Sequence, residues 1–185
     1  MAVLDIVRLG HPLLRTPAPA VPPKEIGSER IQGLIDDMIV TMRGARGVGL
    51  SAPQVEVGLQ IFVYEVTEDP DLPGGPVPLK VVLNPMIVAQ PGRLVYDWEG
   101  CTSIPSLRGL VPRHPAVRVR GLDRHGDPVD FRATGLESRI VQHEYDHLNG
   151  VVFLDRMRDL RSLAFSREWK QYMAGEENTE HAAVV

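Results

Sequence analysis

The chain has 185 residues, a length typical of one domain. Hydrophobic residues make up 43% and charged residues 24%, a globular composition that excludes collagen-like, disordered and disulfide-stapled classes. The net charge of −4 argues against direct nucleic-acid binding, and the single cysteine, Cys101, has no partner for an internal disulfide. We therefore expect one domain over residues 1–185, with a disordered polar tail over about 175–185.

The amino-terminal segment does not resemble a secretory signal, because Asp5 and Arg8 interrupt its apolar residues. No apolar run approaches the roughly 20 residues that a membrane-spanning helix needs. The sequence therefore predicts a cytoplasmic protein that does not bind membranes.

The first elements are an extended proline-rich arm over residues 17–23 and a helix after it. Apolar side chains recur every three or four residues between Ile31 and Met42, which predicts one buried helix face. Ser28 is positioned to cap the start of this helix, and Gly44 to end it.

Short runs of β-branched and apolar residues follow, separated by turn residues. They predict strands over residues 60–66, 79–88, 116–122 and 129–133, and the glycine- and proline-rich stretch 69–78 predicts a surface loop.

A second helix is predicted to begin at Thr134, which forms a capping-box pattern with Glu137. Asn149 and Gly150 are predicted to end this helix, and a third helix is predicted over residues 159–173. We expect an α+β fold with antiparallel or mixed β-sheets packed around the second helix, together with an N-terminal and a C-terminal helix.

The second helix carries the pattern HExxH at residues 143–147. His143 and His147 are four residues apart, so both imidazoles lie on one helix face and can bind one metal ion. Glu144 lies about 100° around the helix, where a general base for a metal-activated water molecule is needed. The pattern therefore predicts a hydrolytic metal site.

Two histidines leave such a site one protein ligand short, and three patterns could complete it. The metzincin pattern fails, because Phe153 occupies the position of its third histidine. Glu168, which follows His147 by 21 residues, fits the thermolysin-like pattern, and Cys101 offers a thiolate. Spacing within the helix does not decide between these two ligands.

Two further segments accompany the helix: GVGLSAPQ at residues 47–54 and EGCTSIP at residues 99–105. Together with QHEYDH at residues 142–147, they resemble the peptide deformylases, with all three family motifs in the family's order. The similarity extends over roughly residues 3–170.

This resemblance implies a hydrolase that removes the N-formyl group from the N-terminal methionine of newly synthesised polypeptides and releases formate. It implies one divalent metal ion, natively Fe²⁺, with Zn²⁺, Ni²⁺ or Co²⁺ as possible substitutes. Carried over by motif, Cys101, His143 and His147 are the metal ligands and Glu144 is the catalytic acid and base. Gln54 and the backbone N–H of Thr102 match the groups that stabilise the oxyanion.

The resemblance also implies where the substrate lies. The backbones of four residues are expected to pair with the extended peptide: Val48, Gly49, Glu99 and Gly100. Leu136, Arg139 and Ile140 are expected to be further substrate-binding residues. Arg139 departs from the aliphatic residue frequent in bacterial members, and we expect its alkyl stem to line the pocket while its charge reaches solvent. The expected partner is the formyl-methionyl nascent chain, which brings transient proximity to the ribosome.

Two other functions fit parts of the sequence. One is a zincin-type peptidase that uses Glu168 as a ligand, and the other is a catalytically silent metal-binding homologue that acts through protein interactions. Glu144 argues against the second, since a purely structural metal site needs no base beside the ion.

Overall fold

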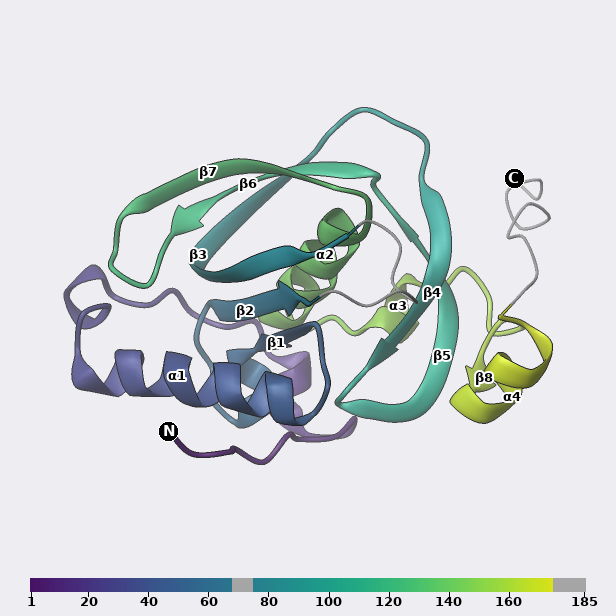
Figure 1. Cartoon of the computed structure of the whole chain (residues 1–185), viewed down its shortest axis with the longest axis horizontal. Coiled ribbons are helices and arrows are strands. Elements are labelled where there is room, and N and C mark those ends of the chain that lie inside the picture. The colour runs from purple at the N-terminus through teal and green to yellow at the C-terminus, as the bar shows by residue number, and fades with distance from the viewer. Residues whose placement is uncertain (68–74, 175–185) are drawn as a thin grey trace.

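The computed structural model describes residues 1–67 and 75–174, and its strands form two antiparallel sheets (Figure 1). The larger sheet has the order β1-β2-β3-β6-β7, with the bounds Gly49–Ser51, Ile61–Val66, Val77–Ala89, Ala116–Leu122 and Pro128–Thr134. The smaller sheet has the order β4-β5-β8, with the bounds Val95–Cys101, Ile104–Arg113 and Ala164–Phe165. The predicted α+β class is confirmed, as are the four predicted strands within a residue or two at their ends.

Helix α2 (Gly135–Leu148) lies between the two sheets, as Figure 1 shows. Its apolar side chains, among them Ile140 and Val141, are buried with Phe62 and Tyr64 of the larger sheet. On its other side α2 contacts β5. The helix with the HExxH pattern is therefore held on two sides, which fixes the direction of its side chains.

Helix α1 (Glu29–Gly44) packs against β1 and β2. The Ser28 side chain accepts a hydrogen bond from the N–H of Ile31, and the apolar face from Ile31 to Met42 is buried. The predicted cap, buried face and end of this helix are confirmed.

The capping box predicted at α2 is absent, although Thr134 does occupy the N-cap position. The Thr134 side chain makes no capping hydrogen bond, and Glu137 instead accepts hydrogen bonds from Tyr64 Oη at 3.0 Å and Lys80 Nζ at 2.6 Å. Glu137 thus joins α2 to the larger sheet. The local pattern was right about where the helix starts and wrong about the contact.

The predicted C-terminal helix over residues 159–173 is also shorter than expected. Helix α4 covers only Ser166–Tyr172, and the residues before it form turns and the short strand β8. Ser162 is buried, and its hydroxyl accepts a hydrogen bond from the N–H of Leu110 in β5 at 3.2 Å. These contacts with β5 hold the chain in a non-helical path.

The remaining elements are short. Within the described ranges they are α3 (Phe153–Arg156) and three 3-10 helices, η1 (Pro12–Arg15), η2 (Pro23–Glu25) and η3 (Ala52–Val55). The predicted proline-rich arm has no regular structure between η1 and η2. Residues 69–74 of the predicted loop (69–78) and the predicted tail (175–185) lie outside the described residues. Among the described residues, no helix combines the length and the apolar character required to span a bilayer.

The N-terminal segment joins two of the sequence motifs. The N–H of Val7 donates to the carbonyl of Gln54 at 2.9 Å, and the N–H of Leu9 donates to the carbonyl of Ser103 at 2.9 Å. Segments around residues 50 and 100 are therefore tied to each other through the start of the chain.

Candidate active site

Three side chains from two elements place donor atoms around one point. His143 and His147 lie on successive turns of α2, and Cys101 ends β4. The Sγ atom of Cys101 lies 3.3 Å from Nε2 of His147, and one donor atom from each side chain lies within 4.8 Å of the other two. In the described part of the chain, Glu168 is not in this group and is exposed in the first turn of α4. The geometry favours Cys101 over Glu168 as the third ligand.

The two histidines have different surroundings. Burial lowers the pKa of His143, but its hydrogen bonds to Cys101 and Glu99 outweigh burial and hold that pKa well above its usual value. The bond to Glu99 joins Nδ1 to Oε2 at 2.9 Å, so Nε2 is the ring atom left for a ligand. Burial and the charges of His143 and Arg113 hold the pKa of His147 well below its usual value. Its imidazole is therefore neutral at pH 7, the form that binds metal ions.

Glu144 turns its carboxylate toward β1. The hydroxyl of Ser51 donates to Oε2 of Glu144 at 2.5 Å, and burial raises the pKa of this carboxyl. Gly49 provides the space, because a Cβ atom at that position would lie 2.8 Å from Cδ of Glu144. A buried carboxylate with a raised pKa is suited to accept and return a proton near neutral pH.

The Gln54 side chain is held in one orientation by a hydrogen bond from a nearby backbone N–H. Its Oε1 atom accepts a hydrogen bond from the N–H of Ser51 at 2.8 Å. This places Nε2 at 3.5 Å from the Sγ atom of Cys101 and at 3.2 Å from Oγ1 of Thr102. A fixed amide donor consequently faces the site, where negative charge on a reacting carbonyl oxygen would be stabilised.

Behind His143 lies a buried network of opposite charges. Glu99 accepts hydrogen bonds from Nε and Nη2 of Arg113 at 2.8 and 3.0 Å, and Arg113 also donates from Nη1 to Asp146 at 2.6 Å. Burial raises the pKa of Glu99, but the hydrogen bonds to Arg113 and His143 outweigh it and lower that pKa far below its usual value. Glu99 thus stays ionised and orients the His143 ring. The sequence predicted only a backbone role for Glu99.

Arg139 belongs to this network, and the prediction that its charge reaches solvent is wrong. The residue is only 8% exposed. Its Nη1 donates to Oε1 of Glu99 at 2.8 Å and to the carbonyl of Val111 at 2.9 Å, while Nη2 donates to the carbonyl of Val95 at 2.8 Å. Because β4 and β5 lie over α2, their carbonyls offer partners that solvent would otherwise provide.

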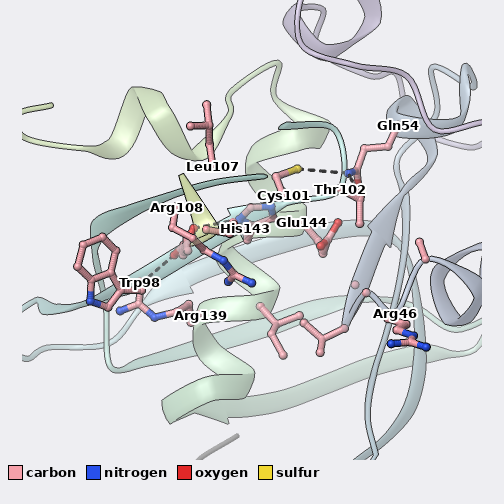
Figure 2. Close-up of a pocket in the computed structure, with 18 of the residues that line it drawn as sticks. Arg46, Gln54, Trp98, Cys101, Thr102, Leu107, Arg108, Arg139, His143 and Glu144 are labelled. Atoms are coloured by element: carbon pink, nitrogen blue, oxygen red, sulfur yellow. Dashed lines mark hydrogen bonds and ion pairs between the residues drawn. The ribbon is translucent and has the colours of Figure 1, made fainter. Parts of the chain in front are cut away.

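A pocket of about 560 Å³ lies beside Cys101 and His143 (Figure 2). The residues predicted to bind substrate all line it: Val48, Gly49, Glu99, Gly100, Leu136, Arg139 and Ile140. Gln54, Thr102 and Glu144 line it as well, whereas His147 is completely buried. The structure therefore brings the site residues that the resemblance implies into one place, and it leaves out only the alternative ligand Glu168.

The other side of the pocket is formed by residues that the sequence did not predict for the site. Its lining also includes Arg46, Trp98, Arg108 and Trp169. The rings of Trp98 and Trp169 lie 5.9 Å apart, centroid to centroid. Trp169 belongs to α4, 68 residues after Cys101, and nothing in its local sequence indicates that β8 brings it back to β5.

The donor set fits a divalent metal ion. A thiolate and two imidazoles in one group suit Fe²⁺, Zn²⁺ or related transition metals better than Mg²⁺ or Ca²⁺, which prefer oxygen ligands. The hydrogen bond from His143 to Glu99 supplies the outer carboxylate that accompanies many metal-binding histidines. The site formed by Cys101, His143 and His147 is therefore a metal site for a divalent cation.

An α+β fold with this Cys/His/His site and a glutamate beside it defines a metal-binding hydrolase. A family model described as Polypeptide deformylase matches residues 3–162. The chain is 40% identical over 165 residues to peptide deformylase 1 of Nitrosomonas europaea, a match that covers 89% of this chain and 93% of that protein. It is 42% identical over 166 residues to the chloroplastic peptide deformylase 1A of Solanum lycopersicum, covering 84% of this chain and 60% of that protein.

The same relationship holds among solved structures. The crystal structure of the class I type b peptide deformylase from Acinetobacter baumannii bound to Met-Ala-Ser has a TM-score of 0.81 and 34% sequence identity, covering 84% of this chain and 99% of that one. The chain belongs to the peptide deformylase family.

Proposed function

We propose that this protein hydrolyses the N-formyl group of formyl-methionyl peptides, with the peptide in the pocket beside Cys101 and His143. The observation that carries the proposal is the convergence of one thiol and two imidazoles with a buried glutamate on the wall of one pocket. The Acinetobacter baumannii relative holds Met-Ala-Ser. This is the peptide that formyl-Met-Ala-Ser leaves when its formyl group is removed.

Cys101, His143 and His147 hold the metal in this proposal. A divalent cation held by these side chains would supply Lewis acidity, which would polarise the formyl carbonyl and lower the pKa of a water molecule. We assign Fe²⁺ as the native ion, because the thiolate of Cys101 favours a softer metal, with Zn²⁺, Ni²⁺ and Co²⁺ as substitutes.

The remaining steps belong to the protein's own groups. The carboxylate of Glu144 accepts a proton from the attacking water and returns it to the leaving amine nitrogen, so formic acid and a free amino terminus result. Nε2 of Gln54 and the backbone N–H of Thr102 donate hydrogen bonds to the carbonyl oxygen as negative charge develops on it. The extended peptide pairs with the backbones of Val48, Gly49, Glu99 and Gly100.

The methionine side chain lies in an apolar subsite formed by Leu136, Ile140 and the alkyl stem of Arg139. We further propose that residues 1–185 form a single catalytic domain that acts in the cytoplasm on nascent chains close to the ribosome. The net charge of −4 supports contact with the peptide rather than with RNA.

The test is formate release from formyl-Met-Ala-Ser amide by protein purified without oxygen and loaded with Fe²⁺ or Ni²⁺. Cys101→Ala and Glu168→Ala form a matched pair. The proposal predicts that Cys101→Ala loses both metal and activity, and that Glu168→Ala keeps both. Full metal occupancy in Cys101→Ala, or a metal-loaded native protein that releases no formate, would contradict it.

A further inference from the structure

Two arginines of the pocket take no part in the network behind His143. Arg46 lies in the loop that connects α1 to β1, and Arg108 lies in β5. Figure 2 shows their side chains on different walls of the pocket. The positive charge of these two side chains is opposite in sign to the net charge of the whole protein, which is −4.

The Arg108 side chain is placed close to the site by a glycine. A Cβ atom on Gly100 would lie 3.0 Å from Nε of Arg108 and 3.1 Å from its Cζ, so the guanidinium crosses the backbone next to Cys101. Cζ of Arg108 also lies 5.4 Å from the ring centroid of Trp169. Backbone and ring thus hold the guanidinium at the pocket without neutralising its charge.

Arg46 is exposed and has a backbone φ of +54°, in the left-handed region. Within residues 1–67 and 75–174, neither Arg46 nor Arg108 forms an ion pair with a carboxylate. The acidic side chains of the pocket have other partners, since Glu99 is bonded to two arginines and Glu144 to Ser51. The two guanidinium groups are therefore left to interact with whatever enters the pocket.

We propose that Arg46 and Arg108 are specificity-determining residues that favour peptides with an acidic side chain at the second or third residue. The inference rests on the proposed function, because it takes the pocket to be the peptide site. An extended peptide advances about 3.3 Å per residue, so residues two and three lie within roughly 7 Å of the methionine. An arginine side chain and an aspartate or glutamate side chain together span more than this distance. An arginine on either wall can therefore reach an acidic side chain at residue two or three.

The expected selectivity is modest, because both interactions face solvent. Exposed ion pairs contribute little each, so two of them favour an acidic over a neutral peptide by about threefold to tenfold at low salt. Screening reduces this preference as ionic strength rises.

The experiment compares kcat/KM for three C-terminally amidated peptides: formyl-Met-Asp-Asp-Ser, formyl-Met-Asn-Asn-Ser and formyl-Met-Lys-Lys-Ser. Asparagine matches aspartate in size, and the amide removes the terminal carboxylate, so the aspartate and asparagine peptides differ only in side-chain charge. The metal-loaded native protein is compared with Arg46→Gln/Arg108→Gln and with Arg46→Glu/Arg108→Glu. Arg93→Gln removes an exposed arginine that does not line the pocket and serves as the control.

The proposal predicts that the Asp/Asn ratio of kcat/KM is about three to ten in the native protein and in Arg93→Gln. It predicts a ratio near one in the Gln double variant and a preference for the lysine peptide in the Glu double variant. A native Asp/Asn ratio within about twofold of one, or a ratio unchanged in the Gln double variant, would overturn the assignment.

A binding measurement separates this inference from the proposed function. The chain has two tryptophans, and both line the pocket, so quenching of their fluorescence reports peptide binding without turnover. If no formylated peptide is hydrolysed, the proposed function fails. Tighter binding of Met-Asp-Asp-Ser amide than of Met-Asn-Asn-Ser amide, lost in the Gln double variant, would still support charge selection, and equal binding would overturn it.

Discussion

The two carboxylates next to His143 are equally buried and opposite in character. Glu144 is 4% exposed and Glu99 is 5% exposed. On the β1 side, Glu144 faces a hydroxyl and has a raised pKa, whereas on the β4–β5 side Glu99 is bonded to two arginines and has a lowered pKa. Burial therefore does not explain why the two pKa values shift in opposite directions. The arginines bonded to Glu99 explain it.

This difference implies a division of labour. On one side of α2, Glu99 is bonded to two arginines and to His143, and this ionic network holds the His143 ring in place. Because its pKa is lowered, Glu99 stays ionised and does not exchange protons during the reaction. The Glu144 side is sparsely bonded and lies against a glycine, so its carboxylate remains available to the substrate. Substitutions on the two sides should therefore have different consequences, on stability at Glu99 and on activity at Glu144.

The largest effect on folding is expected from Glu99→Gln. The change leaves Arg113 and Arg139 buried without their shared counter-charge, which costs about 3–5 kcal/mol of unfolding free energy. It also removes the carboxylate that orients His143, so metal affinity should fall by about 10- to 100-fold. Urea unfolding and metal titration measure the two effects, and a loss below about 1 kcal/mol would contradict the network's role.

The next effect is expected on activity, from Gly49→Ala. A methyl group at this position collides with the Glu144 side chain, and a misplacement of about 1 Å can lower the rate by about 100-fold. Gly47→Ala is the control, because a Cβ atom there would meet its nearest neighbour at 3.4 Å. Rates of formate release decide the matter: equal rates for the two variants would show that the space at Gly49 does not control Glu144.

Arg139→Met should cost less than Glu99→Gln. Glu99 keeps Arg113 and His143 as partners, but the carbonyls of Val95 and Val111 lose a donor, a loss worth about 1–3 kcal/mol. Arg139→Lys restores the charge and should recover part of the loss. If urea unfolding finds Arg139→Met as stable as the native protein, the guanidinium does not hold β4 and β5 to α2.

The smallest effect on stability is expected at the surface ion pair of Arg118 and Asp130, whose length is similar to that of the buried pair of Arg139 and Glu99. Arg118 donates from Nε to Asp130 at 2.6 Å, but the two side chains are 52% and 41% exposed. Water and salt screen such a pair. Arg118→Gln should leave the urea midpoint unchanged within error, and a shift as large as that of Arg139→Met would show that distance rather than burial sets the contribution.

The sequence predicted the parts of this molecule that depend on short-range pattern. The stripe from Ile31 to Met42 predicted α1, and the HExxH spacing predicted two imidazoles on one face of α2. The resemblance to a family then supplied Cys101 as a ligand, which spacing alone had left open against Glu168.

The failures all involve partners distant in the chain. Glu137 bonds to Tyr64 and Lys80 instead of capping its own helix, and Arg139 bonds to the carbonyls of β4 and β5 instead of reaching water. Strand β5, which pairs with β4, has no clear alternation, because Pro105, Gly109 and Pro112 interrupt it. Without that hairpin in view, neither the ionic role of Glu99 nor the position of Trp169 was accessible.

The central claim is that Glu144 moves the proton while Glu99 only holds the metal-binding side of the site. The most direct test is the rate of formate release per bound metal ion for Glu144→Gln, with formyl-Met-Ala-Ser amide as substrate. Gln fills the same space and can keep a hydrogen bond to Ser51. The account predicts native metal content and a rate about 100- to 10,000-fold lower. A rate within tenfold of the native protein at full metal occupancy would contradict it.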